Sequence, residues 1–76
     1  MRFVVLKEYS SINEKILLDR VEFDTYLGAK TLYEYFKSTT NDIKKLYYKG
    51  IVSISIIKEN GEVHDVLDEE YIEVGN

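Results

Sequence analysis

The sequence contains no cysteine, no proline and no tryptophan, and its four glycines stand apart from one another. Without cysteine, a disulfide framework, a zinc ribbon and a thiol nucleophile are all excluded. Isolated glycines do not build the clustered loop that cradles phosphate in nucleotide-binding proteins. No apolar run approaches the roughly 18 uncharged residues of a membrane-spanning helix. We therefore expect a cytoplasmic protein that uses no cofactor and no membrane.

The chain is short, with 76 residues, of which 45% are hydrophobic and 32% are charged with mixed sign. This balance is typical of a folded domain rather than a disordered tail. A domain of this length buries about 60% of its unfolded surface, which leaves little room for a large catalytic cleft. No linker, repeat or low-complexity tract divides the sequence. We expect one domain over residues 1–76 that is not an enzyme.

Alternating apolar residues predict strands in the first third of the chain. Residues 2–9 are rich in Phe, Val and Leu and predict a first strand. Residues 15–23 leave two alternatives. We favour a strand that pairs back on the first, because the segment ends in period-two alternation. The other is a short helix that begins at the capping box of Ser11 and Glu14.

The middle of the chain changes to helical spacing. Asp24 or Thr25 is suited to cap a helix whose apolar face repeats every three to four residues. The cap-forming residues 38–41 interrupt this pattern, and a shorter second helix is predicted to follow and to end at Gly50. The apolar positions of the two helices are Ala29, Leu32, Tyr33 and Phe36, then Ile43, Leu46 and Tyr47.

The last third predicts three more strands. Residues 51–58 alternate branched apolar residues with serine, and Asn60 with Gly61 predicts a type I′ turn into a returning strand over 63–67. Asp68 to Glu70 is expected to turn the chain again before a short strand over 71–74. The predicted fold class is α+β, with order ββααβββ. An antiparallel sheet of four to five strands would carry two helices on one face.

Charge is distributed unevenly along the chain. Residues 1–58 have a net charge of +3, whereas residues 59–76 contain seven acidic residues and no Lys or Arg. Such a segment repels nucleic acid and attracts a basic protein surface. An exposed tyrosine beside the carboxylates adds contact area. The predicted partner-binding residues are Glu59, Glu62, Asp65, Asp68, Glu69, Glu70, Tyr71 and Glu73.

Residue types that serve catalysis or metal binding are sparse. His64 is the only histidine, and as a general base it would need Asp65 or a carboxylate of a neighbouring strand to orient it. Strand alternation places Asp65 on the opposite face, so that adjacent pair is excluded. Ser53 and Ser55 lack the glycine-flanked turn of a serine nucleophile. The acidic residues follow no calcium-loop pattern, and we expect neither a catalytic residue nor a metal site.

A basic and aromatic stretch offers a different binding surface. At helical spacing its lysines and one tyrosine gather on an outward face, opposite Ile43 and Tyr47, where they could contact phosphates and stack a base. The overall charge of −4 opposes this interpretation. The residues of this alternative nucleic-acid face are Lys44, Lys45, Tyr48 and Lys49.

Two functions therefore remain open. The first is a non-catalytic protein that docks its acidic surface on the basic site of a larger host protein, and that could inhibit it as a mimic of nucleic acid. Small, acidic, tyrosine-rich, cysteine-free chains look like proteins that viruses and mobile elements encode to block host enzymes or defence systems. The second is a small nucleic-acid-binding or regulatory domain. In either case, free sheet edges could pair two copies as a homodimer.

Overall fold

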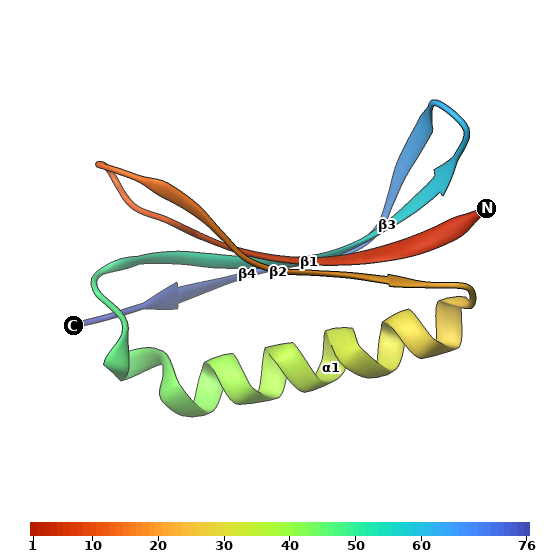
Figure 1. Cartoon of the computed structure of the whole chain (residues 1–76). Helices are drawn as coiled ribbons and strands as arrows, with labels where there is room; N and C mark the ends of the chain where they lie inside the picture. The colour runs from red at the N-terminus through yellow and green to blue at the C-terminus, as the bar shows by residue number, and fades with distance from the viewer.

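The computed structural model describes residues 1–76 as a four-stranded antiparallel sheet with a single α-helix packed on one face (Figure 1). The sheet order is β2-β1-β3-β4, so each hairpin is formed by neighbouring strands and the central pair, β1 and β3, joins the hairpins. The elements are β1 (Arg2–Ser10), β2 (Lys15–Phe23), α1 (Tyr26–Ile43), the 3-10 turn η1 (Lys44–Leu46), β3 (Gly50–Asn60) and β4 (Val63–Val74).

The predicted order ββααβββ is wrong, because the observed order is ββαββ with one helix and four strands. The helix does not stop at residues 38–41. Instead, Thr39 Oγ1 donates to the Tyr35 carbonyl and Asn41 Nδ2 to the Lys37 carbonyl, both at 2.9 Å. These side chains hydrogen-bond to backbone carbonyls of the preceding turn and do not cap a helix end, so the helix continues through them. Only the short turn η1 remains of the predicted second helix.

The acidic residues 68–70 do not turn the chain, and β4 is continuous through them. β4 has a bulge opposite Ile56 and Ile57 of β3, where Leu67 has no partner in the ladder. The strand is thereby kinked rather than ended, as bulges do. Pairing with all eleven residues of β3 holds β4 in one piece.

Residues 15–23 form the favoured strand, β2, and the capping-box helix is not present. The amide of Ser11 donates to the Glu14 carbonyl at 2.9 Å, which closes a tight turn between β1 and β2. The β3–β4 turn differs from the type I′ prediction. Asn60 pairs with Val63, and only Gly61 among the turn residues has a positive φ, +65°. A single positive φ at the first loop residue is the pattern of a type II′ turn.

The start and the apolar face of α1 agree with the sequence. Thr25 is the N-cap, and its side chain accepts a hydrogen bond from the Gly28 amide. Ala29, Tyr33 and Phe36 are buried, and Leu32 is partly buried against them. They pack on the apolar side chains of the sheet, which are Phe3, Val5, Tyr9, Val52, Ile54, Ile56, Ile72 and Val74. The helix is not both long and apolar enough to span a membrane.

The second face of the sheet has no helix on it. Strand alternation turns every second residue away from α1. In Figure 1 the tips of both hairpins also bend away from the helix, at opposite ends of the sheet. We call this side the open face; its central residues are Leu6, Glu8, Ser53, Ser55, Ile57, Val66, Glu69 and Tyr71.

Candidate functional site

A groove of about 310 Å³ crosses the open face. Its floor is β3, where Ser53 and Ser55 present short side chains on this side of the sheet. In the strand register, Ser55 lies between Leu6 of β1 and Glu69 of β4. One step along, Ser53 lies between Glu8 and Tyr71 in the same way. Short residues on the central strand, flanked by longer ones on both neighbours, create the groove.

Curvature of the sheet deepens this arrangement. One bulge interrupts the β1–β2 ladder between Lys7 and Glu8, and another interrupts β3–β4 between Ile56 and Ile57. Bulges bend a strand and increase its twist. Both hairpins curl toward the open side, as Figure 1 shows, so the face is concave along its length. A concave sheet surface fits a convex element such as a helix.

The groove has apolar walls that are exposed to solvent. Val66 is 57% exposed and Tyr71 is 63% exposed, and Leu17 of the edge strand β2 is similarly open. By register Leu17 stands opposite Glu8, which places it on the open face. Large apolar side chains gathered in one concave patch are typical of an interaction surface.

On the β4 side, Glu69 lines the same groove, and Glu73 lies farther along the same face, beyond Tyr71. Glu69 accepts a hydrogen bond of 2.7 Å from the Tyr71 hydroxyl, which raises the pKa of that tyrosine. Neither Glu69 nor Glu73 forms an ion pair, whereas Glu8 pairs with Lys15 at 3.4 Å. The open face therefore presents two uncompensated negative charges beside its apolar wall.

The acidic surface predicted from the sequence is divided by the sheet. Glu59, Glu69, Tyr71 and Glu73 lie on the open face by register. Asp65, Asp68 and Glu70 alternate to the helix side, and Glu62 lies in the turn between β3 and β4. The seven carboxylates thus do not form one surface.

On the helix side, lysines of α1 neutralise part of this charge. Lys30 Nζ lies 3.1 Å from Asp68, and Lys37 Nζ lies 3.9 Å from Glu70. The Tyr26 hydroxyl also donates a hydrogen bond to Asp68. This bond, together with Lys30, lowers the pKa of Asp68. These contacts fasten α1 to the edge strand β4 and leave the two carboxylates little freedom to meet a partner.

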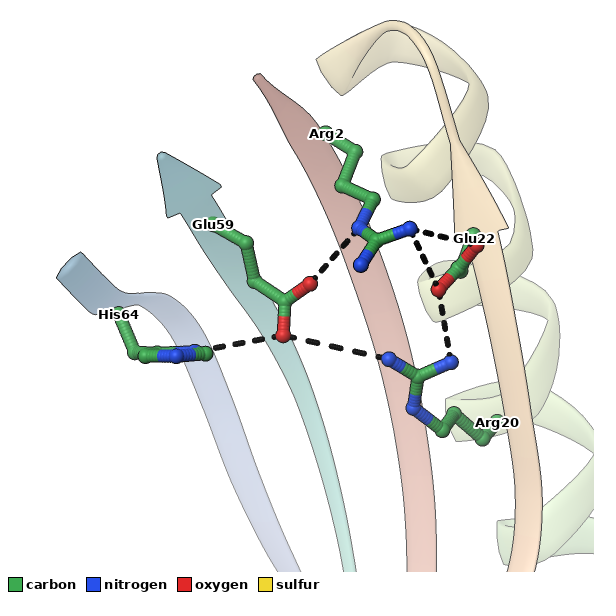
Figure 2. A network of polar contacts seen from close by, with 5 residues as sticks. All are labelled: Arg2, Arg20, Glu22, Glu59 and His64. Carbon is green, nitrogen blue, oxygen red and sulfur yellow. Dashed lines mark hydrogen bonds and ion pairs between the residues drawn. The ribbon is translucent and has the colours of Figure 1, made fainter. Parts of the chain in front are cut away.

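Glu59 also forms ion pairs, in a network that spans all four strands (Figure 2). Its carboxylate accepts from Arg2 Nε at 2.9 Å and lies 3.9 Å from Arg20. Arg20 also pairs with Glu22 at 2.9 Å, which lowers the pKa of that carboxylate. His64 Nδ1 lies 3.3 Å from the same Glu59 carboxylate. A carboxylate of a neighbouring strand does therefore face the histidine, but it is shared with two arginines.

The three lysines of the alternative surface lie around one hollow, although not on a helix, and Tyr48 is not among the residues that line it. Lys44 and Lys45 belong to the 3-10 turn, and Lys49 precedes β3. All three line a depression at the end of the sheet where α1 finishes. Tyr48 is 89% exposed, as the sequence predicted, and Tyr47 packs against the core.

Sequence reasoning missed the apolar half of the open face. The charge pattern alone does not show which side of the sheet lacks a helix. The signal was present in residues 51–58, because the alternation that buries Val52 and Ile54 turns Ser53 and Ser55 the other way. That Leu6 lies beside Ser55, and that Leu17 lies beyond Glu8 on the same face, depends on strand order, which alternation does not reveal.

Clusters that would point to a more specific chemistry are not formed. No group of three or more histidine, aspartate or glutamate side chains gathers in a metal-binding arrangement. Comparisons with protein-family models, curated proteins and solved structures find no match for this chain. Function is therefore inferred from the geometry of the open face and of the lysine depression.

Proposed function

We propose that this protein is a non-catalytic binding domain whose open face receives a cationic, amphipathic helix of a larger protein. The observation that carries the proposal is the concave face with exposed apolar side chains, left without a covering layer. Sheets are normally covered wherever they present apolar residues. Here the covering element would come from the partner.

Charge and shape define the chemistry of that partner. Leu6, Leu17 and Val66 would contact an apolar stripe of the incoming helix. Glu69 and Glu73 have no cation of their own and would face lysine or arginine beside that stripe. Tyr71 provides a large, rigid contact at the rim, and tyrosine is enriched at such positions. The partner surface is therefore basic, although the acidic region that meets it is smaller than the sequence suggested.

The domain would act by holding the basic helix of its partner on the open face. A partner whose basic helix is held on this sheet cannot offer that helix to nucleic acid or to another protein. The domain would then act as an inhibitor in the cytoplasm. The compositional likeness to blocking proteins of viruses and mobile elements agrees with this role.

The test compares two triple variants in a pull-down from host lysate treated with nuclease. The first, V66R/E69K/Y71A, reverses charge and removes apolar area on the open face. The matched control, L27R/D42K/Y35A, makes the same types of change on the outer surface of α1, where all three residues are exposed. Captured proteins are identified by mass spectrometry, and their binding segment is synthesised as a peptide.

The expected result is a protein retained by the wild type and by the α1 control but lost with the open-face variant. Its binding peptide should be helical and basic, and its affinity should fall at least tenfold with the open-face variant, because hot spots each contribute about 1–2 kcal/mol or more. Equal retention by both variants would contradict the proposal. Circular dichroism of both variants verifies that the fold is kept.

A further inference from the structure

The depression at the end of the sheet has the features of an anion-binding site. It is an open hollow of about 1110 Å³ that adjoins one end of the open-face groove, since Ser10 lines both. Three parts of the chain meet there: η1 with the segment that follows it, the turn after β1, and the residues after β4. Figure 1 shows this junction, where the end of α1 and the C-terminus lie on the same side of the molecule. The polar residues that line it include Ser10, Ser11, Lys44, Lys45 and Lys49.

The three lysines differ from most cations of this protein because they have no carboxylate partner. Each of the other surface cations except Lys58 forms an ion pair, namely Arg2, Lys15, Arg20, Lys30 and Lys37. Glu73 is the one acidic side chain that lines the depression, and it pairs with none of the lysines. The local charge is therefore positive, although the whole chain carries −4. At physiological salt, screening over about 8 Å lets this local charge dominate what a ligand experiences.

The backbone that carries these lysines is held in place. The Tyr9 hydroxyl contacts the carbonyls of Tyr48 and Lys49, each at 3.2 Å. The Gly75 amide donates to the Lys44 carbonyl at 2.8 Å. A Cβ at Gly75 would lie 2.5 Å from backbone atoms of Lys49, so only glycine allows this close approach. The lysines thus project from a fixed frame, which reduces the entropy lost when they bind a common ligand.

We propose that the depression binds the phosphates of single-stranded nucleic acid. Three ammonium groups around one hollow suit a flexible chain of phosphates. Tyr48 does not line the depression itself, but it precedes Lys49 in the chain, and its exposed ring can stack on a base of a strand that runs past the lysines. The binding residues are Lys44, Lys45, Lys49 and Tyr48. This inference does not depend on the function proposed for the open face.

The test measures fluorescence anisotropy of a labelled oligothymidylate of about ten nucleotides. Wild-type binding should weaken with salt, with a slope of log K against log salt near −2, as expected for about three phosphate contacts on a single strand. The variant K44A/K45A/K49A should bind at least tenfold more weakly and lose most of this slope. Y48A should weaken binding about fivefold or more while keeping the slope, since stacking is not ionic.

The matched control is K58A, which removes an unpaired lysine outside the depression. It should bind like the wild type. No binding by the wild type at low salt, or equal binding by the triple lysine variant, would overturn the proposal. Inorganic polyphosphate serves as a second probe. If polyphosphate binds as tightly as the oligonucleotide and Y48A changes neither affinity, the site recognises phosphate alone, and the assignment to nucleic acid fails.

Discussion

The two faces of the sheet share the same strands but have different roles. Along β3, Val52, Ile54 and Ile56 are fully buried under α1, whereas Ser53 and Ser55 on the open face remain partly exposed. One strand therefore supplies the core with one set of residues and the groove with the other. The comparison shows how a chain of 76 residues can build its core on one face of a sheet and leave part of the other face exposed.

Most of the buried apolar side chains lie on the face that α1 covers, and Val4 is the exception on the open face. Fully burying a Val or Ile side chain contributes about 1.5–3 kcal/mol. The helix-covered face contains several such residues from β1, β3 and β4. Small domains have a net stability of only about 5–15 kcal/mol, after conformational entropy is subtracted. We therefore expect substitutions on the two faces to have very different effects on the free energy of unfolding.

The largest difference is expected between two neighbours on β3. Ile54→Ala leaves a cavity at a fully buried site and should lower the free energy of unfolding by about 2–5 kcal/mol. Ser55→Ala, the next residue on the open face, should change it by no more than about 0.5 kcal/mol. Urea unfolding followed by circular dichroism measures both. If I54A does not fold, Ile54→Val with an expected loss of about 0.5–1.5 kcal/mol replaces it.

Comparable losses at residues 54 and 55 would contradict the assignment of stability to one face. They would mean that the open face is itself covered in solution, for example by a second copy of the chain. Sedimentation at several concentrations would then identify that copy.

A smaller and opposite effect is expected where the covered face contains a polar group. Thr40 is fully buried in α1, and its hydroxyl oxygen has no hydrogen-bond partner. Thr40→Val keeps the shape and removes the unpaired hydroxyl, so it should raise the free energy of unfolding by about 1 kcal/mol. The control is Thr39→Val, where a partly exposed hydroxyl bonded to the Tyr35 carbonyl is lost. A destabilised T40V in thermal unfolding would show that the Thr40 hydroxyl is satisfied after all.

The smallest effect concerns the charges that fasten α1 to β4. The Tyr26 hydrogen bond and Lys30 lower the pKa of Asp68 below its ordinary value of 3.8. The unfolded chain therefore takes up the proton first, and stability from this contact is present above pH 3.8 and lost as pH falls through the lower folded value. Asp68→Asn should make the acid-induced loss of stability shallower. Asp65→Asn, which removes no hydrogen bond or ion pair, should leave it unchanged in urea titrations at successive pH values.

The sequence predicted the parts of the fold that depend on local spacing. Thr25 and the apolar face of Ala29, Tyr33 and Phe36 identified the start and the buried side of α1 correctly. Period-two alternation identified β3 and the buried side of that strand. These features follow from backbone periodicity, which a short window of sequence contains.

Segment ends were predicted poorly, because hydrogen bonds and ion pairs of the folded chain, some tertiary and some within one helix, override residue preference. Asp68 and Glu70 have low strand propensity, yet Lys30 and Lys37 of α1 neutralise them within β4. Thr39 was expected to end the helix, yet its hydroxyl bonds the preceding turn. The partners of the β4 carboxylates come from a distant element, and the partner of Thr39 is a backbone carbonyl one turn earlier. Residue propensities include neither contact.

Part of the candidate sites followed from the sequence and part did not. Lys44, Lys45 and Lys49 were grouped correctly by their closeness in the chain, although on a 3-10 turn rather than a helix. The carboxylates of 59–76 were treated as one surface, but strand alternation divides them between two faces. The pairing of Arg2 with Glu59 across the sheet required the strand order itself (Figure 2).

The strand order also determines how the chain folds. Each hairpin joins adjacent strands and can form within microseconds. The central pair joins Arg2 to Glu59, 57 residues apart, so the loop that closes between β1 and β3 contains β2 and all of α1. Closing it has an entropic cost that is recovered only when the helix packs on both hairpins together. We therefore expect the meeting of β1 and β3 to limit the folding rate, and neither hairpin to persist without the other.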